Sequence, residues 1–222
     1  FKNGRFYAMP NEAGLIMCAW PKGGLRDDFI KHWQYAYFNE CMSGFEWQAA
    51  SHMVYEGIDN PDILQNGLAI SRAIHDRYNA RLRNPYNEIE CSDHYARAMA
   101  SYGVFQAVCG YNYHGPKGII EFDPRLSPKN FKAPFVSAEG WGSYSQQEDQ
   151  NKLIFKIDLK HGRLKLSEIV IRIPQGKAHD QIKLYFKDKL RPIELKNDEQ
   201  GKLRVAFNSL ILNEKDKLLL EI

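Results

Sequence analysis

One segment in the first half of the chain holds the densest group of reactive side chains. Between Asn84 and Arg97 the sequence has three carboxylates, one histidine and one arginine, most of them in a predicted loop that leads into a helix. A rigid scaffold commonly displays its functional groups on such loops. Carboxylates accept hydrogen bonds from hydroxyl groups and a guanidinium donates them with fixed geometry, so this combination suits a sugar.

Two other interpretations of this segment are possible. Asp93 can cap the helix that follows and pair with Arg97 one turn later, which would be a purely structural role. Glu90, Cys91 and His94 are all metal-ligand types, but their spacing does not provide a full ligand set. We therefore predict no metal site.

Two residues outside this segment are further candidates. Glu40 lies in a second predicted loop and is not needed as a helix cap, so it is either a solvated surface carboxylate or part of a site. Trp141 stands between two glycines, which favour a loop, and it is the best candidate to stack on a sugar ring.

Three helices are predicted to position the two loops. The first begins at a capping box formed by Ser43 and Glu46 and stops at Gly57. The second begins at Asp59 or Asn60, either of which can cap it, and Pro61 follows in the first turn.

A third helix is predicted from about residue 93 to residue 108, with Gly110 as its stop. Short links favour antiparallel neighbours, so the first and third helices should point the same way. The loops at 39–42 and 84–92 would then share one rim of the helical bundle.

The later part of the chain changes to a period of two, typical of strands. We predict a helical domain over 1–128 and a small antiparallel, sandwich-like β unit over 129–222, with a turn at 160–163. The clearest predicted strands are 153–159, 169–173, 182–186, 203–207 and 218–222.

Composition excludes several classes of protein. Hydrophobic residues make up 44% and charged residues 26%, as in an ordinary globular protein, and no apolar run approaches the ~20 residues of a membrane helix. A net charge of only +3 argues against a nucleic-acid partner. Residues 129–222 carry 18 Lys and Arg against 13 Asp and Glu, which we interpret as a solvated sheet face, the alternative being a face for an anionic ligand.

The cysteines and the first residue leave the cellular compartment open. The four cysteines show neither C-x-x-C pairing nor metal-ligand spacing, so buried free thiols are the preferred interpretation. The sequence begins at Phe1 without a charged and then apolar leader, and we expect upstream residues to be missing.

The first part of the chain resembles glycoside hydrolase family 116, the non-lysosomal glucosylceramidase family with its bacterial β-glucosidase relatives. The most specific match is the run from Asn84-Pro-Tyr-Asn-Glu-Ile-Glu-Cys91 to Asp93-His-Tyr-Ala-Arg-Ala-Met-Ala-Ser-Tyr102. Further matching motifs lie at 17–24, 44–53, 74–85 and 138–142, and together they cover roughly residues 5–145.

This resemblance implies an α+β chain: about three helices from the C-terminal part of an (α/α)6 toroid, followed by a small antiparallel β-sandwich-like unit. It implies a retaining mechanism on β-linked glucosides or xylosides, without a cofactor. The glycone-binding residues implied by the match are Glu88 and Arg97, with Glu40 near the same subsite.

Three departures from the family pattern bear on function. Met42 stands where many members have Trp, and Tyr86 and Ser92 replace Trp and Gly. A retaining enzyme needs two carboxyl groups about 5–5.5 Å apart, and no Asp or Glu of this chain matches either one. We therefore expect no catalytic residue here, an inactive isolated chain, and an N-terminal catalytic part as its partner. The alternative is a non-catalytic carbohydrate-binding or domain-docking module.

Overall fold

The computed structural model describes residues 12–18, 22, 31, 33, 40–82, 84–86, 97–149, 152–173, 181–197 and 201–222. The chain forms two compact units, Phe1–Ala107 and Val108–Ile222. The first unit is helical and the second is rich in strands, so the chain is of the mixed α+β class. The unit boundary lies earlier than the predicted boundary after residue 128, because two short strands precede that position.

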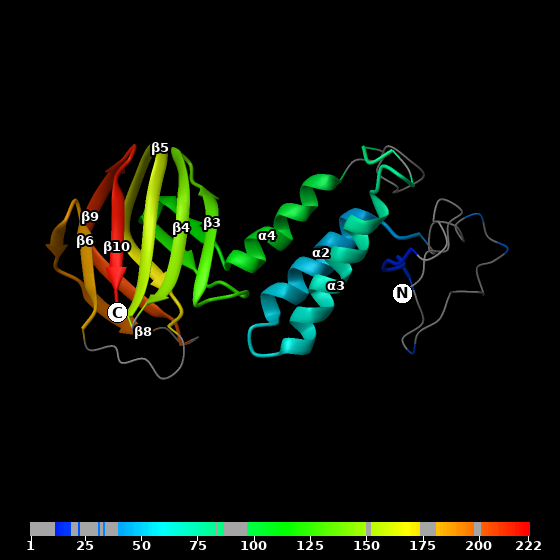
Figure 1. Ribbon diagram of the computed structural model, residues 1–222, viewed down its shortest axis with the longest axis horizontal. Coiled ribbons are helices and arrows are strands. Elements are labelled where there is room, and N and C mark those ends of the chain that lie inside the picture. Colours follow the sequence, from blue (N-terminus) through cyan, green and yellow to red (C-terminus); the bar gives the residue numbers. More distant parts are fainter. Residues whose placement is uncertain are drawn as a thin grey trace. The chain divides into compact units, whose positions relative to one another are not determined.

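Two packed helices dominate the helical unit. α2 spans Ser43–Glu56 and α3 spans Pro61–Arg77, and the start of α2 contacts the end of α3 through an ion pair of Glu46 and Arg77. The two helices are therefore antiparallel, as predicted from their short link, and Figure 1 shows them side by side. A 3₁₀ turn at Ala98–Ala100 leads into α4 at Ser101–Cys109.

The predicted ends of the first two helices are confirmed except at one place. The third helix, predicted from about residue 93, is described only from residue 97 onward, where Arg97 is not helical and α4 begins at Ser101. The Asn60 side chain accepts from two N–H groups in the first turn of α3, and Gly57 terminates α2. The predicted capping box of Ser43 and Glu46 is wrong. Met42 is the cap residue of α2 without a side-chain hydrogen bond, because the Glu46 carboxylate is instead paired with Arg77.

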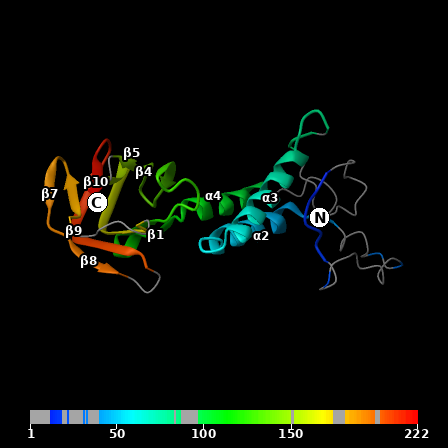
Figure 2. The ribbon, with the colours of Figure 1, turned by 60° about the horizontal axis from the view of Figure 1, so that its bottom comes forward.

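The β unit consists of two sheets that share one strand. Sheet A has the strand order β1, β2, β5, β9 and β8, and sheet B has the order β3, β4, β5, β10, β6 and β7. Figure 2 separates the layer of β8 and β9 from the layer of β7 and β10. The strand bounds are β1 Asn112–His114, β2 Ile119–Phe122, β3 Asn130–Val136, β4 Gly140–Asp149, β5 Lys152–Ile171, β6 Lys183–Phe186, β7 Lys189–Arg191, β8 Glu194–Asn197, β9 Leu203–Asn213 and β10 Lys217–Glu221; a 3₁₀ turn spans Gly115–Lys117.

The shared strand β5 corrects the predicted turn at 160–163. Its 20 residues run without interruption from sheet B into sheet A. A glycine at this point of the sequence suggests a turn. In the structure Gly162 has a left-handed φ of 76° and bends the strand where it passes between the sheets. The buried positions change there from odd numbers such as Leu159 to even numbers such as Leu164.

The core of the β unit lies between the two sheets. It combines side chains of sheet A such as Phe122 and Val205 with side chains of sheet B such as Tyr144 and Leu220. The rings of Phe122 and Tyr144 stack with centroids 3.9 Å apart. One pairing differs from the predicted antiparallel unit, since β2 lies parallel to β5. In the described part of the chain, the helices lack the length and apolar character needed to cross a membrane.

Candidate functional site

A buried ion pair fixes the end of the helical unit where α2 begins and α3 ends. Arg77 Nη1 donates to Glu46 Oε1 at 3.0 Å and to the Ala13 carbonyl at 2.9 Å, while Nη2 donates to the second oxygen of Glu46. The Leu15 N–H donates to Glu46 Oε1 at 2.7 Å. This bidentate pair therefore holds the segment around residue 14 against both helices.

The electrostatics of this end favour a charged arginine and a neutral thiol. Burial lowers the pKa of Arg77, but hydrogen bonding to Glu46 and the charge of Glu46 outweigh it, so the pKa lies above its ordinary value. Burial, followed by the charges of Glu46 and Glu40, raises the pKa of the Cys41 thiol to about 12. Cys41 is thus protonated at neutral pH, which excludes it as a nucleophile there.

Gly14 makes the close approach of these groups possible. A Cβ added at this position would lie 2.6 Å from Glu46 Oε1 and 2.9 Å from Cys41 Sγ. Both atoms belong to side chains that are buried and packed. A glycine is therefore required here by space rather than by backbone conformation.

Two of the predicted site residues lie near this same end. Glu40 lies three residues before the first residue of α2, and its backbone carbonyl accepts from the Met17 N–H at 2.8 Å. The guanidinium of Arg97 lies over the Phe45 ring in the first turn of α2, 5.1 Å from its centroid. Glu40 and Arg97 thus both lie near the start of α2. Glu88 lies outside the described residues.

The burial of Glu40 differs from a solvated surface carboxylate. The residue has 0% of its surface exposed, as does the neighbouring Ser43, and Cys41 and Met42 have 1%. Carboxylates are rarely buried this fully unless they have polar partners. Glu40 is therefore part of the structured interior at the start of α2.

A small hollow opens next to this buried group. Its volume is about 330 Å³, and Leu15, Met17, Met42 and Phe45 line it. Met42, which replaces the Trp of the family pattern, supplies an apolar wall in this hollow. Its lining combines apolar side chains with one carboxylate, that of Glu46.

Trp141 belongs to the β unit and does not lie in a loop, which corrects the prediction. It is in β4, opposite Val136 on β3 and His161 on β5, at a bulge. Its neighbours are glycines because β5 passes close by: a Cβ at Gly140 would lie 2.6 Å from the His161 carbonyl oxygen. Trp141 is 50% exposed.

The Glu46–Arg77 pair is the part of this site that sequence reasoning misses. A signal for it is nevertheless present. Glu46 shares a helix face with Ala50 and Val54, and Arg77 shares one with Ile74, all of them buried. Charged residues at apolar positions of two adjacent antiparallel helices indicate that they pair with each other.

The described residues include no group of three or more potential metal-ligating side chains. Glu90, Cys91 and His94, the metal ligands considered above, lie outside the described part of the chain. Cys18, Cys41 and Cys109 are free thiols.

Comparison with known proteins finds similarity among solved structures alone. No family model and no curated protein match the chain. The solved structures include an alpha-L-rhamnosidase from Dictyoglumus thermophilum, with 17% identity and a TM-score of 0.30 over 55% of this chain and 14% of that one. They also include the Streptomyces avermitilis alpha-L-rhamnosidase complexed with L-rhamnose, with 14% identity and a TM-score of 0.34 over 56% of this chain and 11% of that one.

Both matched proteins are glycoside hydrolases, and the chain spans about one seventh and one ninth of their lengths. TM-scores below 0.5 carry no information about the chemistry of this chain. The function of this chain must therefore follow from its own residues.

Proposed function

We propose that this chain is the C-terminal portion of a retaining β-glycosidase that resembles glycoside hydrolase family 116. In this proposal the nucleophile and the acid/base residue lie upstream, and the helical unit is part of an (α/α)6 toroid. The substrate would be a β-linked glucoside or xyloside. The long motif match over residues 84–102 supports the family, and one structural observation supports the site.

That observation is the position of Arg97 and Glu40. The two residues are 57 positions apart in sequence, yet both lie near the first turn of α2. The resemblance assigns Arg97 to a sugar subsite and places Glu40 near it, and this common position supports the proposal. Glu88 would complete the subsite from the segment between α3 and Arg97.

The buried pair of Glu46 and Arg77 gives this proposed subsite its rigidity. It connects α2, α3 and the segment around residue 14, directly behind Glu40 and Phe45. A glycone-binding group must keep its geometry to within a fraction of an ångström for its hydrogen bonds to strengthen in the transition state. Trp141 is proposed only as a surface for stacking on a sugar, since its exposed ring suits that role.

The decisive experiment replaces the proposed hydroxyl-binding residues in the longer protein that carries the upstream carboxylates. Glu88→Gln and Arg97→Lys should each lower kcat/KM on an aryl β-glucoside by at least ~10²-fold, because contacts of this kind strengthen in the transition state. Glu56→Gln is a matched control, since Glu56 is an exposed carboxylate at the far end of α2.

Two results would reject the proposal. Activity of Glu88→Gln within a few-fold of the control would remove Glu88 from the subsite. Turnover by the isolated 222-residue chain, abolished by Glu88→Ala, would mean that the chain holds its own acid/base machinery. Because Glu40 is fully buried, Glu40→Gln should lower thermal stability as well as kcat/KM.

A further inference from the structure

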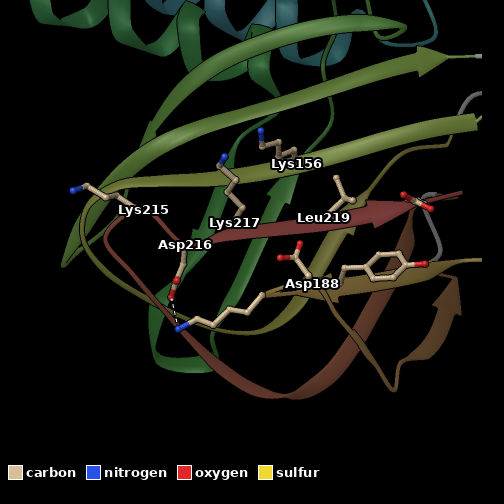
Figure 3. A pocket seen from close by; sticks show the side chains of 9 residues that line it. Lys156, Asp188, Lys215, Asp216, Lys217 and Leu219 are labelled. Carbon is tan, nitrogen blue, oxygen red and sulfur yellow. Dashed lines mark ion pairs between the residues drawn. The ribbon is translucent and has the colours of Figure 1, made fainter.

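A second and larger hollow lies on the outward face of sheet B. Its volume is about 800 Å³, within the ~300–1,000 Å³ usual for ligand pockets. Strands β5, β6 and β10 form its floor, and the turns after β6 and before β10 form one side (Figure 3). All of its lining residues belong to the β unit, so the hollow is independent of the helical site.

The floor of this hollow has an apolar strip with a lysine at one end. Leu219 on β10 pairs with Lys156 on β5 and with Tyr185 on β6, so the three side chains form one row across three strands. Both Tyr185 and Leu219 are half-buried. Tyr185 lies on the opposite face of β6 from the buried Leu184 and Phe186. An aromatic ring beside an aliphatic side chain suits the C–H face of a sugar ring.

Lysine side chains border this strip. Lys156 and Lys217 extend from neighbouring strands (Figure 3), and neither forms an ion pair with a residue that the structure describes. Lys187, by contrast, is paired with Asp216 at 3.2 Å. Like charges on adjacent strands repel, so an anion placed between Lys156 and Lys217 would lower the energy of this face.

Carboxylates also line the hollow and limit what the ligand can be. Asp188 and Glu221 both contribute to the lining. They would accept hydrogen bonds from hydroxyl groups but would repel a continuous row of phosphates. The lining therefore offers lysines for an acidic group, carboxylates for hydroxyl groups and an apolar strip for ring carbons.

Tight turns form one side of the hollow. Lys187 and Asp188 are the two loop residues of the hairpin between β6 and β7, and their φ values of 53° and 56° are those of an ordinary hairpin turn. Lys215, with a φ of 71°, lies in the turn between β9 and β10. These turns bring their side chains to the edge of the hollow.

We propose that this hollow binds an acidic oligosaccharide, a short glycan whose rings carry both hydroxyl and carboxylate groups. The uronate carboxylate would lie between Lys156 and Lys217, and an adjacent ring would lie on Tyr185 and Leu219. This site is separate from the proposed glycone subsite and does not depend on the glycosidase assignment. The β unit would then hold the protein on an acidic glycan.

Calorimetric titration of the complete 222-residue chain at low salt tests the proposal. The probes are trigalacturonate, its fully methyl-esterified form and inorganic triphosphate. Trigalacturonate should bind with a Kd below a few millimolar and should weaken as salt increases, because its contacts are partly ionic. The neutral ester should bind at least five-fold more weakly, and triphosphate should also bind more weakly than trigalacturonate.

Matched variants locate the binding. Lys156→Gln combined with Lys217→Gln should weaken trigalacturonate binding at least five-fold. Lys165→Gln removes an exposed lysine from the same strand β5, in its sheet A half, and should change binding less than two-fold. Tyr185→Ala should weaken binding of trigalacturonate while leaving that of triphosphate unchanged.

Several outcomes would overturn the inference. One is the absence of trigalacturonate binding at concentrations up to 10-fold above the expected Kd. Others are triphosphate binding as tightly as trigalacturonate, or Lys165→Gln weakening trigalacturonate binding as much as the double lysine variant does. Circular dichroism of each variant establishes that the sheets are intact, and any variant that loses its strand signal is replaced by Lys156→Arg and Lys217→Arg, which should retain binding.

Discussion

At the scale of single residues, the Glu46–Arg77 pair is the most constrained group of the helical unit. Both side chains are at most 3% exposed, and three hydrogen bonds from Arg77 and Leu15 meet at the Glu46 carboxylate. Breaking such a pair leaves one buried charge without compensation. We predict that Arg77→Ala lowers the free energy of unfolding by about 3–5 kcal/mol, measured by urea denaturation.

Two comparisons separate this effect from general helix destabilisation. Arg72→Ala removes an exposed ion pair with Asp76 on the same helix and should have a much smaller effect. Replacing both buried partners with apolar residues, Glu46→Leu and Arg77→Met, should recover most of the loss. An Arg77→Ala loss equal to that of Arg72→Ala would contradict the prediction.

The raised pKa of Cys41 predicts a pH dependence of stability. In the folded chain this pKa is raised from 9.0 to about 12, so folding keeps the thiol protonated. The corresponding stability is fully present below pH 9 and is lost as the pH rises from 9 towards 12, at roughly 1.4 kcal/mol per pH unit. Urea denaturation at pH 8 and pH 10 should show a smaller decrease for Cys41→Ala than for the unchanged protein.

Cys109 and Tyr111 contribute in the same direction. Burial raises the pKa of Cys109 to about 11 and that of Tyr111, with help from Tyr113, to about 12. The difference between Cys41→Ala and the unchanged protein therefore isolates Cys41. Identical pH dependence in the two proteins would show that this thiol is not buried in solution.

At the scale of elements, β5 depends on Gly162, where the strand passes from one sheet to the other. Its φ is 76°, and a Cβ there would lie 2.9 Å from the Gly140 Cα and closer still to the Glu139 carbonyl oxygen. Gly201 has a similar φ of 71° but open space around it. Gly201→Ala should cost only the ~1–2 kcal/mol expected for an alanine in a left-handed backbone conformation. Gly162→Ala should destabilise the β unit by clearly more, because its Cβ would also clash. Thermal unfolding followed in the far ultraviolet compares the two, and equal losses would refute the steric argument.

How well each element can be predicted depends on how local its determinants are. The start of α3 is predictable because Asn60 and Pro61 act within one turn. The continuation of β5 through Gly162 is not, because the partner that accommodates it, Gly140 on β4, is 22 residues away. For the same reason the Lys156 and Lys217 pair, 61 residues apart, reads in the sequence as two separate solvated lysines.

The candidate site shows the same division. The motif around Arg97 is visible as a sequence pattern, whereas the place of Arg97 over the Phe45 ring of α2 is not, because the two residues are far apart in the sequence. The burial of Glu40 is not visible, because it depends on how separate segments cover it. The sequence alone does not distinguish a solvated carboxylate from a buried one.

At the scale of the whole molecule, the two units differ in how much apolar surface they bury. The β unit has a continuous core between its sheets, whereas the buried cluster of the helical unit comprises Ala50, Ile70 and Ile74 with partly buried neighbours. Met99 and Tyr102, one turn apart along the helical unit, are 80% and 64% exposed. Exposed apolar side chains of this kind are typical of a surface that another element or a partner covers.

The position of β10 in sheet B has a consequence for synthesis on the ribosome. This strand, Lys217–Glu221, pairs with β5 on one side and β6 on the other, so sheet B has no continuous centre until residue 221 is available. The β unit should therefore remain unfolded while it is being translated, and it should fold only after Glu221 has left the exit tunnel. Nascent chains stalled before residue 217 should be protease-sensitive throughout the β unit, and early protection of β5 would contradict this order.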